Sequence, residues 1–72
     1  MTNELERIRI GLRVAELRKE RGWTQTELGE RCGIRQTHIA RIENGKYNVQ
    51  VDTLAAIAKA FCMTIDFIKQ QP

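Results

Sequence analysis

The chain has 72 residues, of which 42% are hydrophobic and 29% are charged, and its formal net charge is +3. A chain of this length buries only about 60% of the surface that its unfolded form exposes, so we expect a single domain over residues 1–72. The balance of apolar and charged residues is typical of a globular domain and excludes a disordered tail. The small positive charge alone does not decide between a nucleic-acid partner and any other.

Several functional classes are disfavoured at once. The region around Glu4 and Glu6 lacks the basic start of a signal peptide, and residues 54–58 are the longest apolar run, so we expect a cytoplasmic protein without a membrane span. His38 is the only histidine, and Cys32 and Cys62 have no neighbour at metal-ligand spacing. We therefore expect no metal and no cofactor. No nucleophile–base pair, carboxylate dyad or glycine-rich phosphate loop suggests an enzyme.

The first predicted helix covers residues 3 to about 21. Charged residues separate its apolar positions, and Thr2 or Asn3 can cap its start. Gly22 suits the left-handed position that follows a helix end. The apolar positions recur at helical spacing and are Leu5, Ile8, Ile10, Val14 and Leu17.

The second predicted helix covers residues 25 to about 32 and has the strongest local signal in the chain. Thr24 and Glu27 form a T-x-x-E capping box, and Trp23 and Leu28 occupy the two positions of a hydrophobic staple. We interpret Trp23 as a staple and core residue rather than a base-stacking platform. Gly33 should end this helix.

The third predicted helix begins at residue 35 or 36 and closes near Asn44 and Gly45. Because Ile39 and Ile42 face inward, Thr37 and Arg41 should point away from the core. The two short helices, joined by a turn around residues 33–34, would form a helix-turn-helix unit over about residues 24–44.

The last two predicted helices lie beyond a loop at residues 46–50. One starts near residues 50–52 and carries Leu54, Ile57, Ala58 and Phe61 at the spacing of an amphipathic helix. A fifth, short helix is expected over residues 65 to about 70, capped by Thr64. The predicted class is therefore all-α with five helices.

The outward side of the third helix has the chemistry of a major-groove reader. Arg41 can bond O6 and N7 of guanine together, Gln36 can pair with adenine or hold a phosphate, and Thr37 can contact a thymine methyl. Its single acid, Glu43, lies near the inward side, where it would need a partner such as Arg18. His38 projects sideways and is interpreted as a surface histidine.

These residues resemble the helix-turn-helix domain of phage repressor and Cro-type regulators, the XRE family. The resemblance rests on Thr24 and Gln25, Leu28, Gly33, Ile39, residues 42–45 and residues 54–61, and spans about residues 10 to 68. It implies a compact five-helix, lambda-repressor-like fold that binds double-stranded DNA.

The resemblance also implies roles for individual residues. Gln36, Thr37 and Arg41 match base-reading positions, and Arg18 with Glu43 matches a structural salt bridge. The positions expected to hold DNA phosphates are Gln25, Asn44, Arg35 and Lys46. Three residues depart from the family pattern: Gly29 replaces the usual Ala, Arg35 replaces a Ser or Thr cap, and Cys62 replaces a helix-ending Gly.

The assembly and partners follow as expectations. Ile65, Phe67 and Ile68 would leave apolar surface at the end of the chain, which favours a homodimer interface. A two-fold dimer would place its two reading helices about 34 Å apart on a near-palindromic site. The chain's size and residues 47–51 are similar to controller proteins of restriction-modification systems. An antitoxin that also holds a toxin, and a protein-interaction module of the same fold, are the alternatives.

Overall fold

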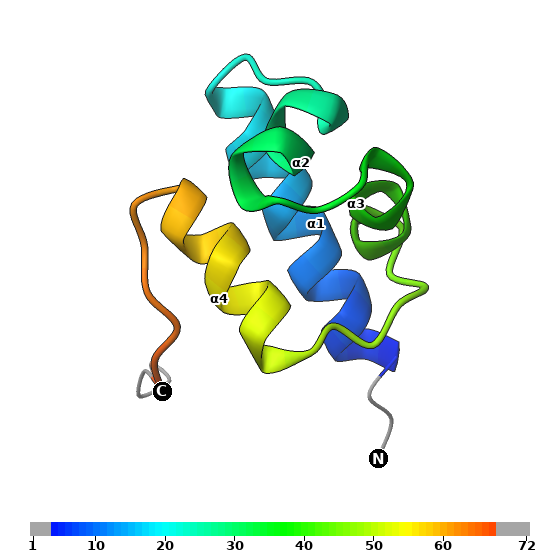
Figure 1. Ribbon diagram of the computed structural model, residues 1–72. Helices are drawn as coiled ribbons and strands as arrows, with labels where there is room; N and C mark the ends of the chain where they lie inside the picture. Colours follow the sequence, from blue (N-terminus) through cyan, green and yellow to red (C-terminus); the bar gives the residue numbers. More distant parts are fainter. Residues whose placement is uncertain (1–3, 68–72) are drawn as a thin grey trace.

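The computed structural model describes residues 4–67, which contain four helices and no strand. The helices are α1 (Glu4–Glu20), α2 (Gln25–Cys32), α3 (Gln36–Glu43) and α4 (Val51–Ala60). Figure 1 shows the long α1 passing behind the others, with α2 across its end and α3 and α4 on opposite sides of it. The predicted all-α class is confirmed. None of these four helices is long and apolar enough to cross a membrane.

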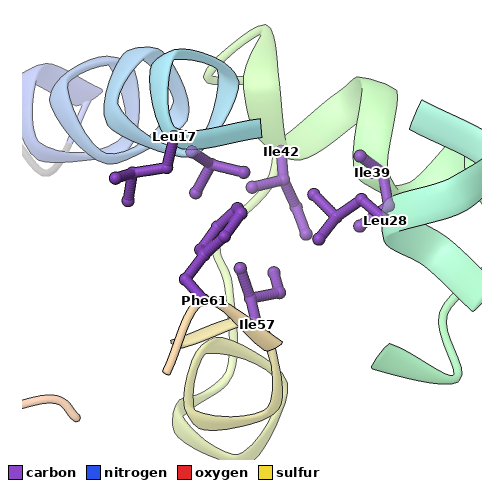
Figure 2. Packing of buried hydrophobic residues seen from close by; sticks show 7 residues of the cluster. Leu17, Leu28, Ile39, Ile42, Ile57 and Phe61 are labelled. Carbon is purple, nitrogen blue, oxygen red and sulfur yellow. The ribbon is translucent and has the colours of Figure 1, made fainter. Parts of the chain in front are cut away.

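One apolar core joins all four helices, and Figure 2 shows its side chains meeting between them. Burying an aliphatic or aromatic side chain of this size stabilises a fold by roughly 1.5–3 kcal/mol, so this core is the main source of stability. It excludes the start of α1, where Leu5 is 66% and Ile8 41% exposed. The buried apolar residues are Val14, Leu17, Leu28, Ile39, Ile42, Ile57 and Phe61.

Helices α1 and α3 approach each other through Gly11. A Cβ atom at this position would lie 2.3 Å from the carbonyl oxygen of Ile42 and 2.8 Å from that of Glu43. Such distances are far inside van der Waals contact, so only glycine fits here without a shift of the backbone. This close crossing fixes the C-terminal end of α3 against α1.

The start of α2 has both hydrogen bonds of the predicted capping box. Thr24 Oγ1 accepts from the backbone N–H of Glu27 at 3.0 Å, and the Thr24 N–H donates to Glu27 Oε1 at 2.8 Å. At the other end, Gly33 adopts the predicted left-handed conformation with φ of +73°. These local signals fix where the turn between α2 and α3 begins.

Gly29 has a second role that helix propensity alone does not reveal. The Ile34 N–H donates to the Gly29 carbonyl at 2.8 Å as the chain folds back over α2. A Cβ at Gly29 would lie 2.3 Å from the Ile34 carbonyl oxygen. The glycine therefore permits the tight turn that leads into α3.

The two other departures from the family pattern have visible consequences. Arg35 occupies the N-cap of α3 and makes no side-chain capping hydrogen bond. Cys62 follows α4 in the left-handed region with φ of +60°, where a side chain costs roughly 1–2 kcal/mol. The Met63 N–H donates to the Ala58 carbonyl at 2.8 Å and closes the end of α4 around this residue.

The prediction of a fifth helix is wrong for the described part of its range. Residues 63–67 have no helical structure, and Ile68 and the rest of the predicted helix lie outside the described residues. Thr64, Ile65 and Phe67 are modest helix formers, and a helix of one or two turns forms in water only when it is packed. Here Ile65 is 48% exposed and the Phe67 side chain is fully exposed, so packing does not support a helix.

Candidate nucleic-acid interface

The exposed side of α3 is the candidate interface. Ile39 and Ile42 are essentially fully buried on its inner side, with exposures of 0% and 1%. Because each residue advances a helix by about 100°, Thr37 and Arg41 lie on the other side. They are exposed together with Gln36. We call Gln36, Thr37 and Arg41 the reading surface.

The residues predicted to hold phosphates surround the reading surface. Arg35 precedes α3, and Asn44 and Lys46 follow it, and all three are exposed. Gln25 is half-buried at the first position of α2. The candidate phosphate contacts therefore lie at both ends of α3 and at the start of its neighbour, as a helix seated between two DNA strands would require.

Arg18 of α1 and Glu43 of α3 form an ion pair beneath the reading surface. Arg18 Nε donates to Glu43 Oε2 at 2.7 Å, and Arg18 Nη2 donates to Glu43 Oε1 at 3.0 Å. Their side chains are only 12% and 6% exposed. A third bond joins Arg18 Nη1 to the Trp23 carbonyl at 2.8 Å. The hydrogen bond with Glu43 raises the pKa of Arg18, so the guanidinium stays charged at every physiological pH.

Two glutamines extend this pair to the reading surface. Gln25 Nε2 donates to Glu43 Oε1 at 3.0 Å, and Gln36 Nε2 donates to Gln25 Oε1 at 2.7 Å. Sequence reasoning placed a phosphate contact at residue 25 and a base contact at residue 36 but missed the bond between them. Gln25 is the first residue of α2 and Gln36 the first residue of α3. The short turn between the two helices is the feature of the sequence that could have predicted their proximity.

Tyr47, which sequence reasoning did not assign, packs against the opposite flank of α3. Its ring meets the His38 ring edge-on with centroids 4.3 Å apart, and the Arg41 guanidinium carbon lies 5.8 Å from the Tyr47 centroid. An arginine within about 6 Å of an aromatic centroid gains a weak cation–π attraction. Tyr47 therefore limits where Arg41 can go.

His38 differs from the surface histidine that was expected. The residue is half-buried, and its Nε2 atom is buried without a hydrogen-bond partner among residues 4–67. It borders a hollow beside α3 that contains two guanidinium groups and no carboxylate. The residues lining the hollow are Arg35, Thr37, His38, Arg41 and Tyr47.

The Trp23 side chain packs among other side chains. Its ring stacks on Phe61 with centroids 5.7 Å apart and an interplanar angle of 11°. The Arg31 guanidinium carbon lies 4.2 Å from the Trp23 ring centroid. Trp23 is half-buried against the core, which confirms its interpretation as a packing residue.

Of the residues predicted to form a dimer interface, the structure describes Ile65 and Phe67, in the segment that follows α4. Ile65 and Phe67 are exposed, and Ile68 lies outside the described residues. Ile65 also lines an apolar groove between α1, α4 and the segment that follows α4. Leu17, Ile57 and Phe61 form part of the groove's inner wall.

Comparison with known proteins gives a consistent assignment. Residues 14–68 match the model of the helix-turn-helix family HTH_3. The chain is 36% identical to the immunity repressor protein of Bacillus phage phi105 over 59 residues, which cover 82% of this chain and 41% of that protein. It is 39% identical to an uncharacterised HTH-type transcriptional regulator of Sinorhizobium fredii over 51 residues, or 71% of this chain and 66% of that protein.

A solved structure has the same fold. The restriction-modification controller protein C.AhdI from Aeromonas hydrophila superimposes with a TM-score of 0.83, covers 88% of this chain and 91% of its own, and is 24% identical. At that identity the likeness establishes the fold alone. With the family model matched over most of its length, the chain belongs to the helix-turn-helix family HTH_3.

Proposed function

We propose that this chain is a sequence-specific regulator of transcription that binds double-stranded DNA with α3 in the major groove. The observation that carries the proposal is the exposed reading surface. Glu43, the only carboxylate of α3, does not point outward beside it but is bonded to Arg18 and Gln25. Outward donors can bond the acceptors of a base edge, and a surface without carboxylates avoids repulsion from the DNA phosphates. The repressor and regulator names of the relatives support a role in transcription.

Individual roles follow from hydrogen-bonding chemistry. Arg41 would read guanine through O6 and N7, and Thr37 would contact a thymine methyl. Gln36 would read a base edge, while Gln25, Arg35, Asn44 and Lys46 would hold phosphates. Phosphate contacts release counterions, so affinity should fall steeply as salt rises. The proposed activity is DNA binding rather than catalysis. We expect it to take place in the cytoplasm, where such a regulator meets DNA.

The same proposal includes a homodimer. The exposed Ile65 and Phe67 beside the apolar groove of α1 and α4 support it, because a second copy would cover this surface. A two-fold dimer predicts a near-palindromic site with half-sites about 34 Å apart. A monomer in sedimentation at binding concentrations, or a one-sided site, would contradict this part of the proposal.

Selection from randomised duplexes followed by arginine replacement tests the proposal. Arg41→Ala should weaken binding to the selected site by roughly 5- to 150-fold, the loss of one bidentate base contact, and should weaken random DNA much less. Lys19→Ala removes an equal charge from an exposed position on α1 and is the matched control. Equal losses on both DNAs would refute base reading by Arg41. Absence of any salt-sensitive enrichment would favour a protein-interaction module or a toxin-binding role.

A further inference from the structure

We propose that Glu43 determines which hydrogen-bonding groups Gln36 presents on the reading surface. Glu43 would act at a distance, through Gln25, as a positioning residue. Its effect on the geometry of the free protein is independent of DNA. Only the last step, the choice of base, rests on the proposed function.

The anchor of this arrangement is the carboxylate of Glu43. Arg18 donates to both of its oxygens, at 2.7 and 3.0 Å, so the carboxylate plane cannot turn without breaking a bond. Arg18 is itself held by the Trp23 carbonyl at 2.8 Å. An ionised carboxylate accepts hydrogen bonds and never donates them, so any group that faces it must be a donor.

This requirement fixes the direction of the Gln25 amide. Its NH₂ group has to face Glu43, and Nε2 lies 3.0 Å from Glu43 Oε1. The Gln25 carbonyl oxygen then points the other way and can only accept. Turning the amide over would set two oxygens against each other at Glu43. One Gln25 N–H remains, which suits the phosphate contact proposed for this residue.

The direction is passed on to Gln36. Its Nε2 atom donates to Gln25 Oε1 at 2.7 Å, so one of its two N–H groups is used. One N–H and the carbonyl oxygen remain for the exposed side. A donor beside an acceptor is the complement of the adenine edge, which offers N7 and N6–H. With the amides reversed, Gln36 would present two N–H groups, the complement of N7 and O6 of guanine.

The Glu43 hydrogen-bond series, which comprises Arg18, Glu43, Gln25 and Gln36, therefore predicts adenine at the base step that Gln36 reads. The step is located first by finding where Gln36→Ala relaxes the preference of the wild type. At this step the wild type should favour adenine over guanine by roughly 5- to 150-fold, the discrimination of one bidentate pair.

The decisive variant replaces the acceptor by a donor. The exchanged pair Arg18→Glu with Glu43→Arg keeps both charges but places a guanidinium, which only donates, next to Gln25. Both glutamine amides should then turn over. The protein should favour guanine over adenine at this step. The neutral pair Arg18→Met with Glu43→Gln imposes no direction and should reduce the adenine preference by at least tenfold or to parity. Val14→Ala leaves a cavity in the core without touching the series and should keep the adenine preference.

A measurement on the free protein keeps the two proposals distinguishable. In the wild type, side-chain NH₂ resonances of Gln25 and Gln36 should show hydrogen-bonded shifts and slow exchange, and both should change in the neutral pair, with circular dichroism reporting folding. If DNA is not bound but these resonances behave as described, the proposed function fails and the Glu43 series stands. Solvent-like resonances in the wild type, or an unchanged adenine preference in a folded neutral pair, would overturn the inference.

Discussion

The two flanks of α3 hold their exposed side chains by different kinds of contact. On one flank, Gln36 is joined through Gln25 to the buried pair of Arg18 and Glu43. On the other, the Arg41 guanidinium carbon lies 5.8 Å from the centroid of the Tyr47 ring, and no hydrogen bond joins these two side chains. Hydrogen bonds have a donor end and an acceptor end, whereas an aromatic face attracts a cation in many orientations.

This difference suggests a division of labour within one helix. The bonded flank is the side of α3 on which Gln36 bonds to Gln25 and, through it, to Glu43. These bonds set both the position of the Gln36 amide and which of its donors and acceptors face outward. The aromatic flank restricts the position of Arg41 but leaves its guanidinium donors free to turn, which suits the base contact proposed for Arg41. Disturbing the bonded flank should therefore damage both folding and base choice, and disturbing the aromatic flank should damage affinity alone.

The largest effect is expected from Arg18→Ala, which removes the donor that holds Glu43 on the bonded flank. Glu43 would remain buried without its partner, and breaking one side of such a pair typically costs 3–5 kcal/mol of unfolding free energy. Urea unfolding measures this loss. Arg13→Ala breaks an exposed ion pair with Glu16 and should change stability by less than about 1 kcal/mol. Similar small losses in both variants would remove the contrast between the flanks.

Gly11→Ala should be the next largest change, because it forces apart the helices that carry the ion pair. The added Cβ would lie 2.3 Å from the Ile42 carbonyl oxygen, and overpacking of this kind costs about 1–3 kcal/mol. Thermal unfolding followed by circular dichroism would detect it. Leu12→Ala, at an exposed position on the same helix, serves as the reference and should stay within about 0.5 kcal/mol. If Gly11→Ala were as stable as the wild type, α1 and α3 would not be in close contact at this position.

Tyr47 tests the aromatic flank directly. Tyr47→Ala removes the ring beneath Arg41 and should weaken binding to the selected DNA by roughly 2- to 5-fold, equivalent to about 0.5–1 kcal/mol. Tyr47→Phe keeps the ring and should bind nearly as the wild type does. Fluorescence anisotropy on both proteins, after a check of folding, separates the two cases. Equal losses would assign the effect to the hydroxyl rather than to the ring.

The smallest expected change lies outside both flanks. Cys62→Gly removes a side chain from a left-handed position and should stabilise the fold by about 0.5 kcal/mol, since relief of the φ penalty is partly offset by the backbone entropy of glycine. Base preference should not change. A shift in preference with this variant would show that stability alone alters DNA reading, and the comparison between flanks would lose its meaning.

Most of the framework was predictable because its determinants are local. The capping box of Thr24 and Glu27 and the left-handed Gly33 are encoded within a few residues, and they define α2 and the turn that follows it. The family resemblance supplied the pairing of Arg18 with Glu43. The exposed position of Thr37 and Arg41 followed from helical periodicity once Ile39 and Ile42 were placed inside.

The remainder depended on contacts between distant residues. The fifth helix was expected from apolar spacing, yet spacing does not supply the packing that a short helix requires, and residues 63–67 lack it. The bond between Gln25 and Gln36 and the position of Tyr47 beside His38 depend on side-chain geometry across elements. Periodicity predicts which way a residue faces but not which partner it meets there.

The bonded flank has a consequence for anyone who wishes to retarget this domain to a new DNA site. Thr37 and Arg41 are exposed and make no hydrogen bond to the series, so each can be exchanged by itself without disturbing the scaffold. Position 36 is different, because its amide belongs to a set that includes residues 25 and 43. In a library that varies position 36 alone, most side chains would not match the donor and acceptor groups of residues 25 and 43. Varying the three positions together would allow new specificities in which the donors and acceptors match again.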